Sequence, residues 1–145
     1  MIPTEPAGKG SHILGRLIFQ LQRLEREPRR FGEAGVLTPS EIHMIDAIGC
    51  DSGMLMSELA GRLGVTKGAV TQLVAKLESK ELVQRGSHPN DSRAVVISLT
   101  ATGKSAYRAH EAVHHEFYQE LSRQFTPEEI AVFERCIEKL TQMLK

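Results

Sequence analysis

The side chains best suited to recognise another molecule lie between residues 66 and 80. Hydroxyl and amide groups come first and lysines follow, and the set is Thr66, Lys67, Thr71, Gln72, Lys76 and Lys80. If this segment is a helix, they share its outer face. A helix that enters the major groove of DNA has this arrangement, with early side chains at base edges and cations at phosphates. An ordinary solvated helix face is the alternative reading.

A second polar cluster follows at residues 86–94, GSHPNDSRA, which is rich in turn-forming residues. Residues 82–85 before it and the β-branched residues 95–99 after it predict two strands, so we expect a β-hairpin with an extended tip. The tip groups that we expect to contact DNA are His88, Asn90, Ser92 and Arg93. Arginine suits a narrow minor groove, where the negative potential is concentrated. A plain solvated loop is the alternative.

Asp91 has the wrong charge for a DNA contact. We expect it instead to support the tip by holding an arginine, Arg93 or Arg62, in a fork-shaped ion pair. In this interpretation the carboxylate orients the cation that reaches the groove.

These groups need a scaffold, and residues 56–83 predict a helix-turn-helix. Leucines recur at four-residue intervals from 55 to 63, which gives the first helix an apolar face. Gly64 suits the left-handed position that ends this helix, and Thr66 can cap the next one. The inner stripe of that second helix is Val70, Leu73, Val74 and Leu77.

Long amphipathic helices flank this module, and the expected ranges are 11–26, 38–49, 100–125 and 126–144. Thr38, Pro39 and Glu41 form a capping box at the second of them, and Thr126 with Pro127 opens the last. The apolar stripes of the first and the last two helices need a partner surface. A second copy of the chain is the simplest one, and a monomeric bundle that buries all three stripes is the alternative.

The predicted fold is therefore mainly α with a small β-hairpin wing, a winged helix-turn-helix. Residues 1–145 form a single chain of this kind. Residues 37–100 are the expected DNA-binding lobe, and residues 11–30 and 101–145 are the expected dimerisation helices.

Composition is consistent with this class of protein. The 145 residues are 41% hydrophobic and 25% charged, with a net charge of zero. Charge is nevertheless segregated, because residues 60–93 hold six cations and three anions, a net of +3. Residues 1–12 lack the apolar core of a signal peptide and look like a short flexible arm, and no apolar run could span a membrane. We therefore expect a cytoplasmic protein with two reduced thiols, Cys50 and Cys136.

Enzymatic activity has little support in the sequence. A nucleophile elbow and a phosphate-binding loop are both lacking. A metal-dependent hydrolase built on the histidines would need an open ligand position, which a full set of protein ligands does not leave. A winged helix that binds another protein instead of DNA is a further alternative, and its apolar interface would be far less sensitive to salt.

The chain resembles the multiple-antibiotic-resistance repressor (MarR) family of winged-helix regulators. The resemblance covers about residues 13–144 and is carried by LTPSE at 37–41, by residues 56–83, by DSR at 91–93, and by Leu99-Thr100 with Gly103. It implies a homodimer joined by the first and last helices. It also implies a repressor, or less often an activator, of a double-stranded operator, whose affinity responds to a small ligand bound between the two domains.

The resemblance also assigns Arg93 as the wing arginine and Asp91 as its partner. One departure concerns the turn after the second helix of the helix-turn-helix. Family members commonly have glycine there, whereas this chain has Glu81. The turn into the first wing strand must therefore be made by a residue with a side chain.

Histidines form the second informative group. His110 and His114 are four residues apart on one predicted helix, so both rings lie on the same face. With His43 and the carboxylate of Glu25 they would make a four-ligand site suited to Zn²⁺. This set is similar to the one in zinc-responsive members of the family.

Two other readings of the histidines stay open. Similar histidines also occur in family members that repress fatty-acid synthesis genes and respond to acyl chains, so the effector could be an organic or acyl molecule. His110 and His114 also share a stripe with Tyr107 and Phe117, so they could be packed structural or pH-sensing side chains.

Overall fold

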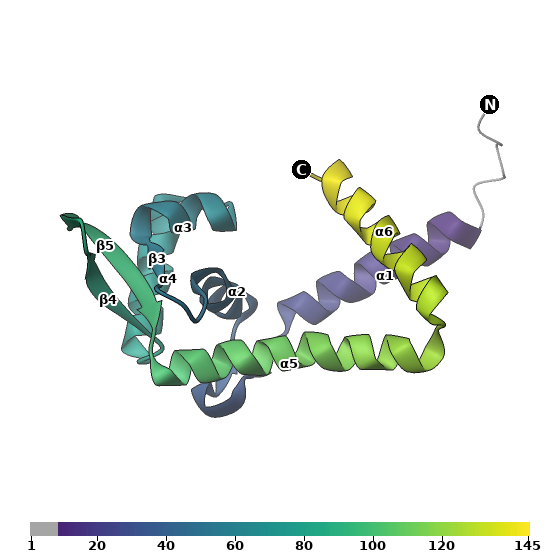
Figure 1. Cartoon of the computed structure of the whole chain (residues 1–145), viewed down its shortest axis with the longest axis horizontal. Coiled ribbons are helices and arrows are strands. Elements are labelled where there is room, and N and C mark those ends of the chain that lie inside the picture. The colour runs from purple at the N-terminus through teal and green to yellow at the C-terminus, as the bar shows by residue number, and fades with distance from the viewer. Residues whose placement is uncertain (1–8) are drawn as a thin grey trace. The chain divides into compact units, whose positions relative to one another are not determined.

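A computed structural model describes residues 9–145 (Figure 1). Most of the expected N-terminal arm, residues 1–8, lies outside the described part. The elements are α1 (Lys9–Arg26), β1 (Arg29–Arg30), a short 3-10 helix η1 (Gly32–Ala34), β2 (Val36–Leu37), α2 (Pro39–Ile48), β3 (Met54–Leu55), α3 (Met56–Leu63), α4 (Lys67–Ser79), β4 (Val83–His88), β5 (Asp91–Leu99), α5 (Ala101–Gln124) and α6 (Pro127–Met143). The chain divides into two units, with the boundary between Tyr107 and Arg108.

The hydrophobic core of the first unit lies between α2, α3, α4 and a small sheet. Its fully buried side chains include Leu37, Met44, Ile45, Leu59, Val70, Val74, Leu77, Leu82 and Ile97. The predicted inner stripe of α4 is confirmed at three positions, while Leu73 is half-buried. These helices bury one face each and leave the opposite face of α4 free for other contacts.

Local capping fixes where the helices of this unit begin and end. Thr38 and Glu41 form the predicted capping box of α2, with Pro39 in the first turn. Gly64 ends α3 in the left-handed conformation, with φ 66° and ψ 32°. The Thr66 side chain accepts a hydrogen bond from the Ala69 amide and so caps α4. All of these predictions are confirmed.

The sheet is three-stranded and antiparallel, in the order β3-β5-β4. The sequence prediction missed β3, because it assigned Leu55 to the apolar repeat of the following helix. Leu55 instead pairs with Val96 and serves as the N-cap residue of α3. A two-residue strand has no periodicity of its own, and only pairing with Val96 and Ile97, far along the chain, defines it.

A tight junction joins the end of α4 to the start of α5. Glu81 makes the turn with φ 60°, in the left-handed region. Its carbonyl accepts a hydrogen bond of 2.7 Å from the Thr100 hydroxyl, and that hydroxyl accepts one of 3.1 Å from the Gly103 amide. A Cβ atom on Gly103 would lie 2.0 Å from the carbonyl oxygen of Leu82. Thr100 is therefore the cap of α5.

The N-terminal helix α1 buries none of its residues. Its apolar side chains at heptad-like spacing, Leu14, Leu17, Leu21 and Leu24, are each about half exposed. Its predicted amphipathic pattern is therefore present, but the apolar face has no cover within the described chain.

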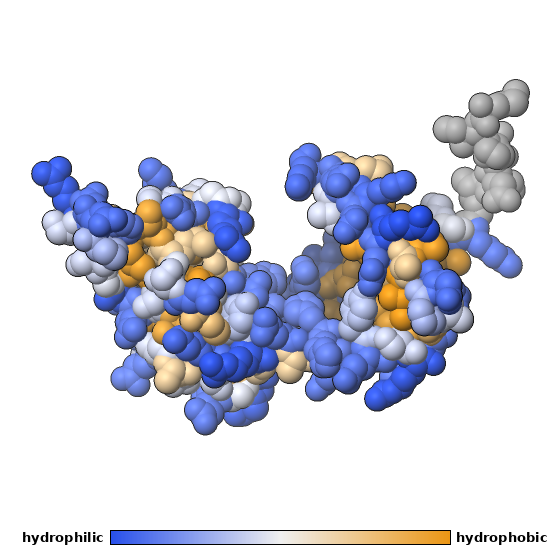
Figure 2. Space-filling model, in the orientation of Figure 1, coloured by the Kyte–Doolittle hydropathy of each residue, from blue (hydrophilic) through white to orange (hydrophobic). Residues whose placement is uncertain are grey.

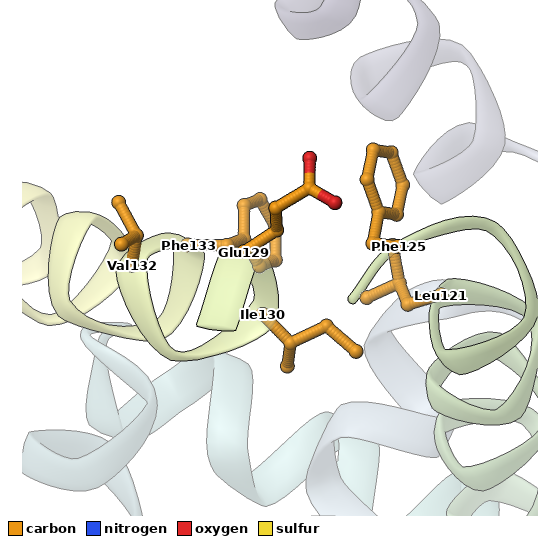
Figure 3. Close-up of a pocket in the computed structure, with 6 residues that line it drawn as sticks. All are labelled: Leu121, Phe125, Glu129, Ile130, Val132 and Phe133. Carbon is orange, nitrogen blue, oxygen red and sulfur yellow. The ribbon is translucent and has the colours of Figure 1, made fainter. Parts of the chain in front are cut away.

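The second unit is formed by the remainder of α5 and by α6. Thr126 and Glu129 form a capping box at the start of α6, as predicted. The Tyr118 hydroxyl donates a hydrogen bond to the Glu134 carboxylate and ties the two helices together. An apolar groove of about 420 Å³ lies between them, with Leu121 and Phe125 on one side and Ile130 and Phe133 on the other (Figure 3).

Like α1, the C-terminal helix α6 has no buried residue. Its apolar seam, with Phe133, Ile137 and Leu140 each 40–45% exposed, leaves apolar surface over this helix (Figure 2). Within residues 9–145, none of the helices combines the length and the apolar character that a membrane span requires.

Candidate nucleic-acid interface

The outer face of α4 presents the polar groups singled out in the sequence. Thr66, Lys67, Thr71, Gln72 and Lys76 are all exposed. The Thr71 hydroxyl donates a hydrogen bond of 3.0 Å to the Lys67 carbonyl, so it is held against its own helix. Gln72 makes no such local bond in the described structure, and its amide can both donate and accept. This face is therefore able to read hydrogen-bonding groups on a surface that lies across α4.

A mixed groove of about 370 Å³ runs beside this face, between α2 and α4. His43 of α2 and Gln72 and Lys76 of α4 contribute polar groups, while Leu63 and Val65 form part of its apolar wall. The structure therefore places His43 beside the outer face of α4.

The wing is formed by β4 and β5, which project as a hairpin beyond α3 and α4 (Figure 1). His88 pairs with Asp91 across the tip, leaving Pro89 and Asn90 as the turn. The strands therefore reach much further than predicted, and the expected long loop is wrong. Alternation of apolar residues stops near the tip, so the sequence pattern could not show that backbone pairing continues there.

Side chains at the tip brace the backbone of the turn. The Asn90 amide donates a hydrogen bond of 3.1 Å to Nδ1 of His88, and the Arg93 amide donates one of 2.9 Å to Oδ1 of Asp91. Asp91 thus supports residue 93 through its backbone, in place of the expected ion pair with the Arg93 or Arg62 guanidinium. Asn90, Ser92 and Arg93 are exposed, as a groove contact requires, and His88 is half-buried.

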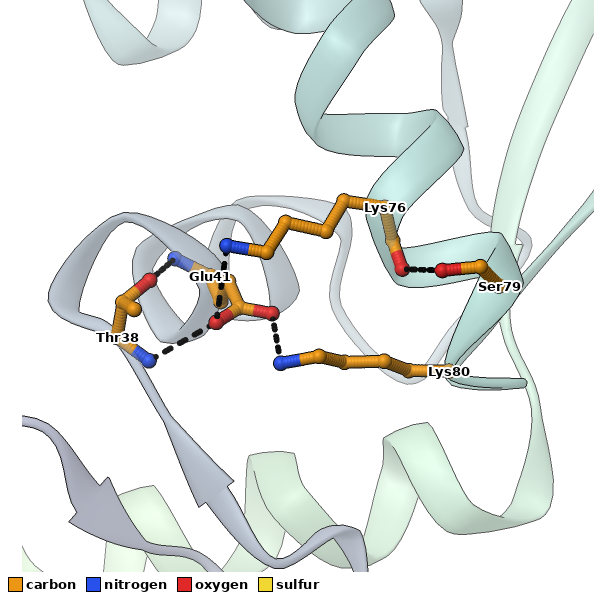
Figure 4. A network of polar contacts seen from close by, with 5 residues as sticks. All are labelled: Thr38, Glu41, Lys76, Ser79 and Lys80. Atoms are coloured by element: carbon orange, nitrogen blue, oxygen red, sulfur yellow. Dashed lines mark hydrogen bonds and ion pairs between the residues drawn. The ribbon is translucent and has the colours of Figure 1, made fainter.

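A buried carboxylate connects α2 to the end of α4, and the sequence prediction missed it. Among residues 9–145, Glu41 is the only charged residue that is buried, with its side chain 1% exposed. Its Oε2 accepts a hydrogen bond of 2.6 Å from Lys80, and Oε1 accepts one of 3.1 Å from the Thr38 amide (Figure 4). Nζ of Lys76 lies 3.9 Å from Oε1. Lysines four residues apart on one helix are the only signal that could have suggested a shared anion.

Electrostatics keep this carboxylate ionised. Burial raises the pKa of Glu41, but the hydrogen bonds from Lys80 and Thr38 outweigh it and hold the pKa below its ordinary value. A charged Glu41 at neutral pH is therefore a permanent counter-ion for the end of α4.

The histidines of α5 form a close pair. Nε2 of His110 and Nε2 of His114 are 3.3 Å apart, and the two rings meet edge to face. His43 lies on α2, and Glu25 lies in the last turn of α1. In the part of the chain that the structure describes, no group of three or more His, Cys, Asp or Glu side chains is close enough to hold a metal ion. The four-ligand site stays a prediction.

Comparisons with known proteins agree with this architecture. The sequence model described as the MarR family matches residues 37–95. The multiple antibiotic resistance protein MarR of Escherichia coli K12 is 30% identical over 129 residues, which cover 88% of this chain and 90% of that protein.

Two solved structures are similar over nearly the whole chain. Streptococcus pneumoniae FabT, in complex with DNA, superposes with a TM-score of 0.78 at 27% identity, covering 94% of this chain and 97% of FabT. Lactococcus lactis ZitR, described as a zinc-responsive MarR family member, gives a TM-score of 0.64 at 28% identity, covering 93% of this chain and 96% of ZitR.

Proposed function

Because this chain belongs to the MarR family of transcriptional regulators, we propose that it represses transcription by binding a palindromic DNA operator as a homodimer, and that a small effector changes its affinity. Residues 37–100 act as the DNA-binding lobe, and residues 11–30 and 101–145 act as the dimerisation helices.

One observation carries the DNA-binding proposal. The outer face of α4 and the wing tip both expose hydrogen-bonding and cationic groups and belong to one structural unit. A helix in the major groove with a hairpin in the flanking minor groove needs these two surfaces together. FabT, whose fold this chain shares, is described in complex with DNA. We accordingly infer a cytoplasmic DNA-binding protein and neither an enzyme nor a protein-only adaptor.

Dimerisation has separate support from α1 and α6. Each helix leaves a continuous apolar seam about half exposed, as Leu17 on α1 and Ile137 on α6 illustrate. Seams of this kind are covered in a symmetric dimer, and two-fold symmetry would present two copies of α4 to a palindromic site.

Selection of bound duplexes from a random library tests DNA binding without knowledge of the operator. Arg93→Ala should weaken binding to every selected duplex, because it removes a groove and phosphate contact. Gln72→Ala should instead change which base pairs are preferred. Arg123→Ala, which removes an exposed cation near the end of α5, is the matched control and should bind as the parent does. Failure of the parent to enrich any sequence at low salt would remove the proposal.

For the effector, we propose Zn²⁺ bound by His43, His110, His114 and Glu25. Two nitrogen ligands at about 2.0–2.1 Å from a tetrahedral ion lie about 3.3 Å apart, and the Nε2 atoms of the His110–His114 pair have this separation. The donor set of three imidazoles and one carboxylate also suits zinc. ZitR, at 28% identity, is described as zinc-responsive.

Zinc titration against the selected duplex tests this assignment. We expect the parent to bind zinc and to change its DNA affinity, and His114→Ala to lose both responses while it keeps zinc-free DNA binding. His115→Ala, on the same helix but outside the proposed set, should respond as the parent does. If the parent binds no zinc but responds to acyl chains or another organic ligand, the effector is organic and the metal assignment is wrong.

A further inference from the structure

We propose that Glu41 gives the two lysines at the end of α4 different roles. It holds Lys80 as a structural cation and leaves Lys76 as the phosphate contact. This inference rests on the proposed DNA-binding function. It assigns Glu41 as a positioning residue, because the carboxylate acts on DNA only through the lysines.

The contact between Glu41 and Lys80 has the features of a structural pair. The Glu41 side chain is 1% exposed, and its 2.6 Å bond to Lys80 is the shorter of its two lysine contacts. A buried carboxylate without a counter-ion is costly, so this lysine cannot leave for a phosphate without exposing or stranding Glu41. Lys80 is therefore committed to the fold.

Lys76 is in a different position. Its Nζ lies 3.9 Å from Glu41, beyond hydrogen-bond distance, and its side chain is 53% exposed. A single carboxylate balances a single ammonium group, and Glu41 is already balanced by Lys80. Glu78, the acidic residue of α4, is engaged by Arg85 at 2.7 Å. The charge of Lys76 is therefore not neutralised by either carboxylate, and it lies on the side of α4 that also presents Gln72 to the groove.

A DNA phosphate is the anion that would pair with the Lys76 ammonium group. Lys76 lies one turn after Gln72 on the same side of α4. When Gln72 faces base edges, a lysine one turn further along the helix is placed to meet the sugar-phosphate backbone.

Salt dependence distinguishes the two lysines, because each phosphate contact contributes about 0.9 to the slope of log affinity against log salt. Lys76→Met should lower the slope by about one contact, so that affinity falls about 3.5-fold less than in the parent between 50 and 200 mM salt. Lys80→Met should leave the slope unchanged and lower the melting temperature, because it strands Glu41.

The experiment measures fluorescence anisotropy of a selected duplex across salt concentrations, together with thermal unfolding of each variant. Glu41→Gln combined with Lys80→Met removes both charges of the buried pair, so it should recover much of the stability and keep the parental slope. If Lys80→Met, or this double variant, loses as much slope as Lys76→Met, both lysines contact phosphates and the inference is wrong. An unchanged slope in Lys76→Met also overturns it. If the parent binds no duplex, the proposed function itself has failed.

Discussion

Glu81 occupies a backbone conformation that favours glycine. Among residues 9–145, it is the only non-glycine residue with a positive φ. Side chains at this conformation cost about 1–2 kcal/mol, because Cβ crowds the following carbonyl oxygen. Glu81→Gly should therefore raise the free energy of unfolding by about 1 kcal/mol, after the greater freedom of glycine in the unfolded chain is subtracted. Urea denaturation measures this difference.

Glu81→Ala separates backbone strain from loss of the carboxylate. Alanine removes the same charge but keeps Cβ, so this variant should not be stabilised. Equal stabilisation of both variants would show that the carboxylate, and not the backbone, is unfavourable at this turn.

Glu41 predicts how stability depends on pH. Its pKa is depressed in the folded protein, because the hydrogen bonds from Lys80 and Thr38 outweigh the opposing effect of burial. A depressed pKa stabilises the fold above the unfolded value, about 4.3 for glutamate, and this contribution is lost as pH falls through the folded value.

We therefore expect the unfolding free energy of the parent to fall below about pH 4.3 more steeply than that of Glu41→Gln. The variant should be less stable than the parent at pH 7, because Lys80 loses its counter-ion. Urea denaturation at several pH values measures both quantities, and the other carboxylates contribute equally to the two proteins. Parallel pH profiles would contradict a depressed pKa at Glu41.

Between elements, the contact of α5 with the turn after α4 tolerates no added atom. A Cβ on Gly103 would lie 2.0 Å from the Leu82 carbonyl oxygen, which is a backbone atom and cannot rotate away. Gly103→Ala should therefore push α5 off this turn and cost about 2 kcal/mol or more, a magnitude typical of overpacking.

Gly61 provides the matched control in α3. A Cβ there meets nothing within 4 Å, so Gly61→Ala should stabilise the protein by up to about 1 kcal/mol through helix propensity. Chemical denaturation of both alanine variants gives the comparison. A neutral Gly103→Ala would mean that α5 can shift without cost.

The elements show which features a single sequence can reveal. The helix starts at Thr38, Thr66 and Thr126 were predictable, because each cap acts on an amide three residues away. The unusual turn at Glu81 was also identifiable as a departure from the family pattern. These signals are local, and they place α4 and its outer face correctly.

Features that depend on distant partners were not predictable. Glu41 was recognised as a capping residue, but its partner Lys80 is 39 positions away. The short strand β3 exists only through pairing with β5, and the outer wing is held by backbone hydrogen bonds that any sequence can form. Asp91 was expected to hold an arginine guanidinium, whereas it accepts a hydrogen bond from the Arg93 amide, and this choice depends on the three-dimensional turn.

At the scale of the whole molecule, the half-exposed seam of α1 predicts that assembly and DNA binding are linked. Leu21→Glu places a charge in this seam and should raise the dimer dissociation constant at least about tenfold, since burial of an unpaired charge is unfavourable. Affinity for a palindromic duplex should fall in parallel, because two lobes no longer bind as one unit. Analytical ultracentrifugation and anisotropy measure the two effects.

Gln20→Glu introduces the same charge beside the seam and should remain dimeric. If Leu21→Glu also remains dimeric and binds DNA as the parent does, α1 does not contribute to assembly.

The strand pairing in the wing sets a minimum length for a duplex that binds stably. In the part of the chain that the structure describes, β3 supports β5 only at Ile97 and Val96, and beyond them β4 and β5 form a lone two-stranded ribbon. Such ribbons are marginally stable by themselves, so this one gains its order from what it touches. Base pairs outside the sequence that α4 reads would then order this ribbon by contacting it. Removing these flanking base pairs, without altering any base that α4 reads, should leave the β4–β5 ribbon mobile and shorten the lifetime of the complex.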